Sequence, residues 1–333
     1  MDDAAETGRD EKPGTEAPAP VPPDEPRGFW RRLGGCITEG TRKGLRAAAW
    51  LLAIMVPISL AVELLSRTGA LGWVASLLEP AFRLIGLPGE TAIAFIIGMA
   101  LNVYSAIAAM SSMVLTQREV TILALMVLIS HNFPVEATVQ HKAGSSGWRM
   151  VALRLTASVA AGVVLHLVLP AETAMAEIEE RTQAAWTIRT AKLTATILVL
   201  VVLLMILQRL LDEFGLIRII SWLLGPVLRL LGLPRSTAFL WIVANTLGLA
   251  YGAAVILEEA ESGRLSKEDV ELLNRSIAVC HSLLEDSALF VAVGAWVLWI
   301  TVPRVMLAAA AVWIYRAWRA AGSSLHGPAT PAE

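Results

Sequence analysis

Long apolar runs recur along the chain and are separated by short polar segments. A helix that crosses a bilayer needs about 20 mostly apolar residues. Stretches of this kind lie at 47–65, 91–115, 150–169, 193–207, 237–257 and 305–318. Their length and spacing predict an all-α protein, a polytopic bundle of transmembrane helices.

Two further apolar regions, 119–140 and 268–300, are interrupted in the middle by polar residues. The first holds Ser130-His131-Asn132 and the second holds Cys280-His281-Ser282. Broken helices or re-entrant hairpins fit these regions better than plain spans. Because backbone that leaves the helix at membrane depth is tolerated only inside protein or beside a cavity, both interruptions predict a functional centre.

The chain contains an internal repeat. Residues 79–92 (EPAFRLIGLPGETA) and 225–238 (GPVLRLLGLPRSTA) are identical at eight of fourteen positions, with an offset of 225 − 79 = 146. Farther along, SHNFPVEA at 130–137 aligns with CHSLLEDS at 280–287, so that His131 pairs with His281 at an offset of 150. The sequence therefore predicts one membrane domain made of two similar halves.

Charge predicts how the two halves are oriented. Cytoplasmic loops collect Lys and Arg, and with the N-terminus inside, the acidic segments 171–186 and 258–271 fall outside. Inverted structural repeats explain this layout better than parallel ones. The resulting segments are a disordered cytoplasmic tail and juxtamembrane segment (1–43), a first repeat (44–170), an acidic linker (171–188), a second repeat (189–320) and a disordered tail (321–333).

Composition narrows the class of protein. Of the 333 residues, 56% are hydrophobic and 17% are charged, against about 25% charged residues in soluble domains. The net charge of −2 gives no excess of basic residues that could neutralise the phosphates of a nucleic acid. Two cysteines exclude a disulfide framework, and the common hydrolase, dehydrogenase and NTPase motifs are absent. No enzymatic activity and no cofactor are expected.

The polar residues of the interruptions are the strongest candidates for chemistry. A charged side chain at the bilayer centre is costly and is usually functional, and central Asn side chains either bind a polar solute or join helices. The expected substrate-binding residues are Asn102, His131, Asn132, Glu136, Asn245, His281, Glu285 and Asp286.

The polar residues of the second interruption also suggest a site for a metal ion or a proton. His281 and Glu285 are spaced i, i+4 and would share a helix face, which suits transient divalent-metal coordination or a proton relay. Arg304 is expected to snorkel to an interface, whereas Arg154 could do this, pair with an acid or bind an anionic group.

The duplicated segment with Arg83-Leu84 and Arg229-Leu230, ending in Gly-Leu-Pro and followed by Thr-Ala and a helix with a central Asn, resembles the Gate or nucleoside-recognition domain family. Similar domains occur in concentrative nucleoside transporters, in the ferrous iron permease and in spore maturation membrane proteins. The resemblance implies a polytopic protein with gating hairpins that moves a small solute or an ion. No GTPase domain like that of the iron permease is evident.

The leading hypothesis is a secondary transporter in the inner membrane, with both termini cytoplasmic, that works by alternating access. Its substrate would be a small polar solute of nucleoside type or a divalent cation. The alternatives are a non-transporting scaffold, as in spore maturation proteins, and an intramembrane metalloenzyme. Small residues in the helices allow a homo-oligomer as readily as contacts within one chain.

Overall fold

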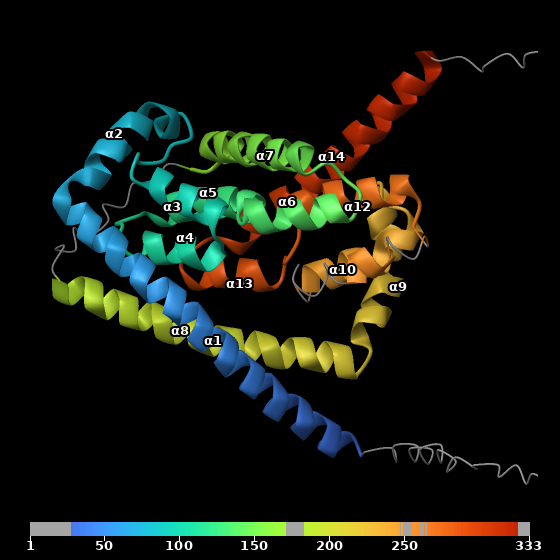
Figure 1. The fold of residues 1–333 in the computed structure, drawn as a ribbon, viewed down its shortest axis with the longest axis horizontal. Coiled ribbons are helices and arrows are strands. Elements are labelled where there is room, and N and C mark those ends of the chain that lie inside the picture. Colours follow the sequence, from blue (N-terminus) through green and yellow to red (C-terminus); the bar gives the residue numbers. More distant parts are fainter. Residues whose placement is uncertain are drawn as a thin grey trace, which may run out of the picture.

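The computed structural model describes residues 28–170, 183–246, 248, 255–259, 263 and 265–325, and within these residues the ordered elements are helices (Figure 1). The first half contains α1 Phe29–Thr68, α2 Ala70–Arg83, α3 Thr91–Ala100, α4 Val103–Met110, α5 Gln117–Ser130, α6 Phe133–Lys142 and α7 Gly147–Val168. The second half contains α8 Gln183–Glu213, α9 Leu216–Leu230, the short 3-10 helix η1 Arg235–Thr237, α10 Ala238–Thr246, α12 Lys267–Val279, α13 Glu285–Ala292 and α14 Val297–Leu325.

Within the described residues, five helical stretches are long and apolar enough to cross a membrane. They are Phe29–Leu65, Gln117–Lys142, Gly147–Val168, Thr190–Glu213 and Val297–Ala321. The prediction of an all-helical protein with membrane-spanning segments is therefore confirmed.

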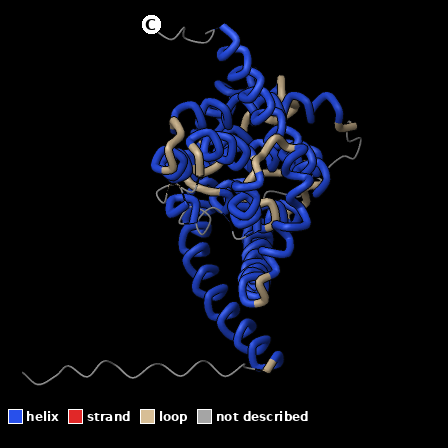
Figure 2. The backbone as a smooth tube through the Cα atoms, turned by 90° about the vertical axis from the view of Figure 1, so that its right-hand side faces the viewer, coloured by secondary structure: helices blue, strands red, loops and turns tan. Residues whose placement is uncertain are grey.

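The long helices α1 and α8 pack against each other along one side of the molecule (Figures 1 and 2). Gly40 and Gly44, one turn apart on α1, face α8 so closely that an added Cβ would lie 2.6 Å from Ile206 Cα and 2.7 Å from Val202 Cα. This small-xxx-small spacing lets two helix backbones approach without side chains between them. It joins the first long helix of each half.

Short amphipathic helices follow each of these long helices. α2 begins after Gly69 and α9 begins after Gly215, two glycines in the left-handed conformation that end the preceding helix. Both helices leave large apolar side chains exposed, among them Trp73 on α2 and Trp222 on α9. Glu79 accepts a hydrogen bond from the Gly89 N–H, which holds the turn between α2 and α3.

The segment 91–115 is not the single spanning helix that its hydropathy predicted. α3 ends at Ala100, and Asn102, in an extended conformation, caps α4 by accepting a hydrogen bond from the Ser105 N–H. α3 then packs along α4 as the two arms of a hairpin. The prediction was wrong because the Asn102 side chain caps a new helix by satisfying one of its N-terminal N–H groups. Beyond Thr246, most of the equivalent segment 237–257 lies outside the described residues.

The predicted interruptions do coincide with helix ends. α5 ends at Ser130 and α6 begins at Phe133, whereas α12 ends at Val279 and α13 begins at Glu285. α6 packs along α7 and continues the course of α5 across the molecule in Figure 1. The arrangement of α5 and α6 therefore differs from the hairpin of α3 and α4.

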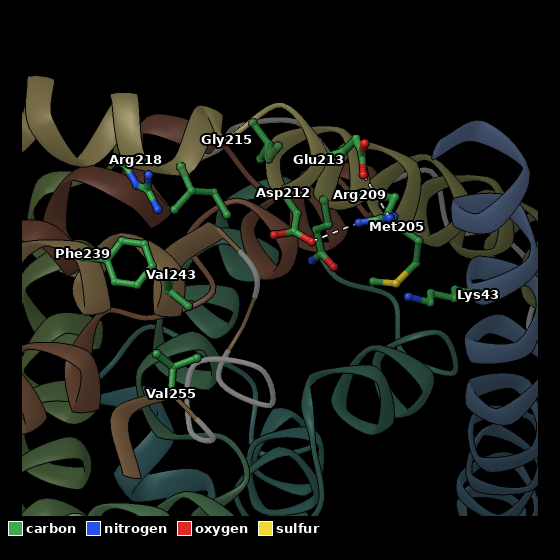
Figure 3. Close-up of a pocket in the computed structure, with 13 residues that line it drawn as sticks. Lys43, Met205, Arg209, Asp212, Glu213, Gly215, Arg218, Phe239, Val243 and Val255 are labelled. Atoms are coloured by element: carbon green, nitrogen blue, oxygen red, sulfur yellow. Dashed lines mark hydrogen bonds and ion pairs between the residues drawn. The ribbon is translucent and has the colours of Figure 1, made fainter. Parts of the chain in front are cut away.

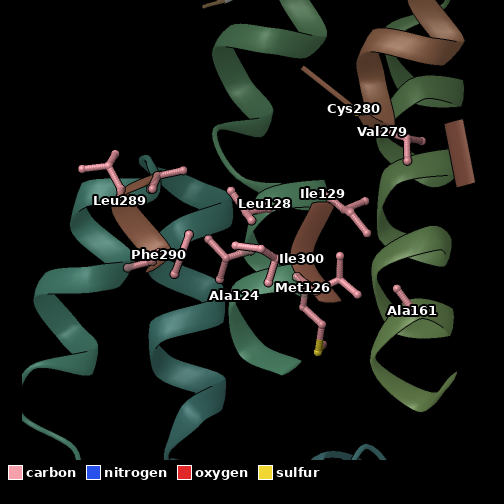
Figure 4. Close-up of a cluster of buried hydrophobic side chains, with 14 of the residues drawn as sticks. Ala124, Met126, Leu128, Ile129, Ala161, Val279, Cys280, Leu289, Phe290 and Ile300 are labelled. Carbon is pink, nitrogen blue, oxygen red and sulfur yellow. The ribbon is translucent and has the colours of Figure 1, made fainter. Parts of the chain in front are cut away.

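The hydrophobic core is centred on α5, whose residues 120–130 are all buried. Figure 4 shows Ala124 and Leu128 gathered with Phe290 of α13 and Ile300 just inside α14. Both halves thus contribute to one core around the first helix break.

Three of the predicted segments contain helical residues. α1 begins at Phe29, α8 at Gln183, and α14 continues to Leu325, so helix extends into the segments 1–43, 171–188 and 321–333. Residues 1–27, 171–182 and 326–333, which include most of the predicted tails and linker, lie outside the described residues.

Candidate functional site

The two helix breaks have the same backbone design. Asn132 and Ser282 adopt positive φ angles of 54° and 47°, the only described non-glycine residues to do so. The Asn132 N–H donates to Gly98 O and the Ser282 N–H donates to Ala244 O, each over 2.9 Å. These matched hydrogen bonds tie the first break to α3 and the second break to α10, each within its own half.

Two buried arginines hold the carbonyl groups at the breaks. Arg154 on α7 donates to Ile129 O at 2.7 Å and to His131 O at 2.6 Å, and Arg304 on α14 donates to His281 O. A helix C-terminus leaves four carbonyls without helical partners, and a cation there is favourable. The expectation that Arg304 snorkels was wrong, because its side chain is fully buried (0% exposed) against the break.

A cavity of about 290 Å³ lies where the two breaks meet. It is lined by seven of the eight predicted substrate-binding residues, namely Asn102, His131, Asn132, Glu136, His281, Glu285 and Asp286. Val103, Tyr104, Met205, Gln208, Gly248 and Ser282 complete the wall. Residues separated by 150 positions in the sequence thus share one cavity.

Two histidines and a glutamate converge in this cavity. Glu136 Oε1 lies 3.2 Å from His131 Nε2 and 3.3 Å from His281 Nε2, and the two Nε2 atoms are 3.3 Å apart. Glu136 Oε2 pairs with Arg154 Nη1 at 2.7 Å. All three side chains are buried, and the trio is a group that could hold a metal ion.

The remaining acids of the cavity have different partners. Glu285 accepts hydrogen bonds from the Tyr104 hydroxyl at 2.9 Å and from Gln208 Nε2 at 3.3 Å. Asp286 Oδ2 lies 3.6 Å from His131 Nε2 and accepts no hydrogen bond from the described residues. This oxygen is buried without a hydrogen-bond partner, although buried polar atoms normally have one.

His281 and Glu285 do not share a helix face, contrary to the i, i+4 interpretation. α12 ends at Val279, and His281 lies in the break before α13, where the Ser282 N–H bonds to Ala244 O instead of continuing the helix. His281 therefore lies beside Glu136 and His131, and Glu285 turns to Tyr104 and Gln208. The spacing rule failed because it assumes a continuous helix.

Asn245 is the predicted residue that does not line the cavity. Its amide nitrogen donates to Trp241 O at 3.0 Å and to Cys280 O at 3.3 Å. The side chain thus joins α10 to the second break. Asn102 reaches the cavity by capping α4, and the position 146 residues later is Gly248, which also lines the wall.

Sequence reasoning did not identify Gln208 as a site residue. It directly follows the apolar run 193–207 of α8 and precedes Arg209, Asp212 and Glu213 on the same helix. Polar residues at the end of an apolar run are ordinary where a helix leaves the membrane, so the position of Gln208 in the sequence does not distinguish it as a site residue. Its partner Glu285 is 77 residues away, which no local pattern reveals.

A second cavity, of about 460 Å³, adjoins the first at the bend between α8 and α9. Met205 and Gln208 line both cavities. Figure 3 shows Arg209 between Asp212 and Glu213 in the wall, with Lys43 of α1 on one side and Phe239 of α10 on the other. The two cavities therefore adjoin at Met205 and Gln208.

The fold and the cavity define a multi-pass helical membrane protein with a buried polar centre. The family model described as "Nucleoside recognition" (Gate) matches residues 48–149. The uncharacterized membrane protein YvoD of Bacillus subtilis (strain 168) is 32% identical over 268 residues, which are 77% of this chain and 86% of YvoD. The chain belongs to this family of Gate-domain membrane proteins. No solved structure matches it.

Proposed function

We propose that the protein is a permease of the inner membrane and that the 290 Å³ cavity holds its substrate. The observation that carries this proposal is the convergence of both helix breaks on one polar cavity inside an otherwise apolar bundle. Secondary transporters bind substrate near the bilayer midplane, at the interface of two repeats and beside discontinuous helices. The contacts above match this design.

Inverted repeats are the second part of the proposal. Along the long axis of Figure 1, α1 starts at the end of the molecule where α14 finishes, and α7 runs back toward the end where α8 begins. If α1, the pair α5–α6 and α7 each cross the membrane, the first half crosses three times. An odd number of crossings makes the second half start on the opposite side, which supports inversion.

The same tracing supports cytoplasmic termini. Arg42, Lys43 and Arg46 lie in the first half of α1, and Arg316 and Arg319 lie in the last turns of α14. The start of α1 and the end of α14 lie at the same end of the molecule along the long axis of Figure 1, and cytoplasmic segments collect Lys and Arg. Alternating access would then open the cavity toward this end through the adjoining cavity at Gln208.

The cavity favours a small cationic or polar substrate. It is lined by the acidic side chains of Glu136, Glu285 and Asp286, whose oxygens can bind a cation or accept hydrogen bonds from a polar solute. Its volume of about 290 Å³ is at the lower end of small-molecule sites, which are about 300–1,000 Å³. Both a small polar solute of nucleoside type and a divalent cation fit these limits.

Uptake by proteoliposomes tests the permease. The purified protein is reconstituted and supplied with nucleosides, nucleobases or divalent cations, each labelled, with and without a proton or sodium gradient. Glu285→Gln should reduce uptake of the substrate about tenfold or more, because a charge-assisted contact contributes about 1.5–3 kcal/mol and 1.4 kcal/mol is tenfold.

The matched control is Glu268→Gln, because Glu268 is an exposed glutamate on α12 outside the cavity. Its uptake should equal that of the wild type. Failure of the wild-type protein to move any of these compounds would contradict the permease and favour a scaffold role.

A further inference from the structure

The geometry points to the chemical class of the substrate: we infer that His131, His281 and Glu136 form a binding site for one divalent first-row transition-metal ion. The ion would be the cargo of the proposed permease, so its transport rests on that proposal. Whether the ion binds is tested separately from whether it moves.

The first argument is the direction of the lone pairs. Nδ1 of His131 lies 3.1 Å from Val127 O, and Nδ1 of His281 lies 2.7 Å from Ile277 O. A carbonyl oxygen only accepts hydrogen bonds, so each Nδ1 carries the proton and each neutral ring presents an Nε2 lone pair to the cavity. The backbone therefore fixes the tautomer of both rings.

Three acceptors then face one point. Glu136 Oε2 is paired with Arg154, which leaves Oε1 beside the two Nε2 atoms. When both rings are neutral, an ionised carboxylate oxygen and two imidazole lone pairs lie 3.2–3.3 Å apart and repel one another, because none of them supplies a hydrogen. A cation among them converts this repulsion into three bonds.

The distances agree with metal coordination. The edge of a tetrahedron is about 1.63 times the distance from its centre to a corner, so edges near 3.3 Å place the ion about 2.0 Å from each donor. Zinc binds His nitrogen and carboxylate oxygen at about 2.0–2.2 Å. Two imidazoles favour such ions over Mg²⁺ and Ca²⁺, which prefer oxygen ligands.

The surroundings also match a metal site. Ligating histidines usually donate their second ring N–H to a backbone carbonyl or a carboxylate, and ligating carboxylates are themselves held by hydrogen bonds. Val127, Ile277 and Arg154 provide these contacts here. Asp286 Oδ2, 3.6 Å from His131 Nε2 and without a hydrogen-bond partner among the described residues, is a further oxygen beside the three donors.

Titration of purified full-length protein with Co²⁺ tests the site. Metal-free wild-type protein in detergent should bind one Co²⁺ per chain with the intense visible absorption of tetrahedral or five-coordinate cobalt, and Zn²⁺ should displace it. His281→Gln and Glu136→Gln should each weaken binding by more than the 10–100-fold typical of lost supporting contacts. His141→Gln is the matched control, because His141 is exposed on α6, and it should bind like the wild type.

Folding of each variant is checked by circular dichroism and gel filtration. Should His281→Gln lose its helical spectrum, His131→Gln removes the same kind of ligand from the other half. Wild-type protein that binds neither Co²⁺ nor Zn²⁺ would overturn the metal site, whatever the variants do. Equal affinity in the wild type and in a folded ligand variant would overturn it as well.

Uptake of Zn²⁺ into proteoliposomes separates the two proposals. Binding with uptake supports both the site and the permease. Binding by a protein that moves neither metal nor solute would keep the metal site and overturn the permease. Uptake of an organic solute by protein that binds no metal would do the reverse.

Discussion

Arg154 and Arg304 show how single residues make a helix break possible inside an apolar core. Each guanidinium donates to the carbonyl of the histidine at its own break, and Arg154 also neutralises Glu136. Buried backbone carbonyls without partners are unfavourable. The two arginines therefore stabilise the conformation that turns both histidines toward the cavity.

Arg154→Met should destabilise the protein strongly. The change removes the partner of the buried Glu136 carboxylate and the donors to Ile129 O and His131 O. Removing one member of a buried ion pair costs about 3–5 kcal/mol. The expected result is a lower apparent melting temperature in detergent, with Arg149→Met, at an exposed position nearby, as the unaffected control. Equal melting temperatures of the two variants would contradict this role.

At the same scale, the sequence identified most of the cavity residues but not their partners. Charged residues and histidines within apolar runs can be recognised from the sequence, because they are rare in membrane helices. Their partners depend on where each helix ends. The pairing of His281 with Glu136 instead of Glu285, and the arrival of Gln208 from α8, follow from tertiary contacts between distant segments.

Among the described elements, α1 and α8 form the most extensive helix–helix contact, and this contact joins the two halves. Gly40 and Gly44 leave no room for a side chain between the two helices. Ala48 extends the same stripe and is buried. Packing of small residues is a main source of association between membrane helices, where no hydrophobic effect separates lipid from protein.

Gly40→Ala should weaken this contact, because the new Cβ would meet the Ile206 backbone at 2.6 Å. Gly35→Ala lies on the same helix with nothing within 4 Å, and it should stabilise α1 by up to about 1 kcal/mol through helix propensity. The two variants should thus shift the apparent melting temperature in opposite directions. A rise for Gly40→Ala equal to that for Gly35→Ala would show that the helices are not in contact.

The hairpin of α3 and α4 shows a limit of hydropathy at the scale of elements. Residues 91–115 are mostly apolar, with a few polar side chains. Hydropathy averaged over such a segment therefore predicts one continuous helix. The decisive feature is local, because Asn102 caps α4 and allows the chain to turn back. The mean apolar character of a segment therefore predicts burial in the membrane better than it predicts the number of crossings.

For the whole molecule, the matched hydrogen bonds of the two breaks extend the sequence repeat into three dimensions. The offsets of 146 and 150 residues read from the sequence relate Gly98 to Ala244 and His131 to His281 in space. Overall class and repeat length were therefore accessible from the sequence. The path of the chain through each half could not be predicted from the sequence, because it depends on which breaks reverse the direction of the chain.

The proposed topology is tested by thiol labelling in inverted and right-side-out vesicles. With Cys36 and Cys280 replaced by serine, single cysteines at Arg31, Arg319 and Thr68 are compared. Arg31 and Arg319 lie at the start of α1 and near the end of α14, whereas Thr68 ends α1. A membrane-impermeant reagent should label Arg31→Cys and Arg319→Cys from one side and Thr68→Cys from the other. Labelling of Arg31→Cys and Arg319→Cys from opposite sides would contradict the inverted repeat.

The position of His131 in the first half and His281 in the second has a kinetic consequence. An ion held by both rings bridges the two halves, and it must lose at least one ligand before the halves can separate. Its residence time would then be set by the rate of conformational opening instead of by diffusion from an open site. An ion of higher ligand affinity would stay longer and cross more slowly, so the fastest ion to cross need not be the one that binds most tightly.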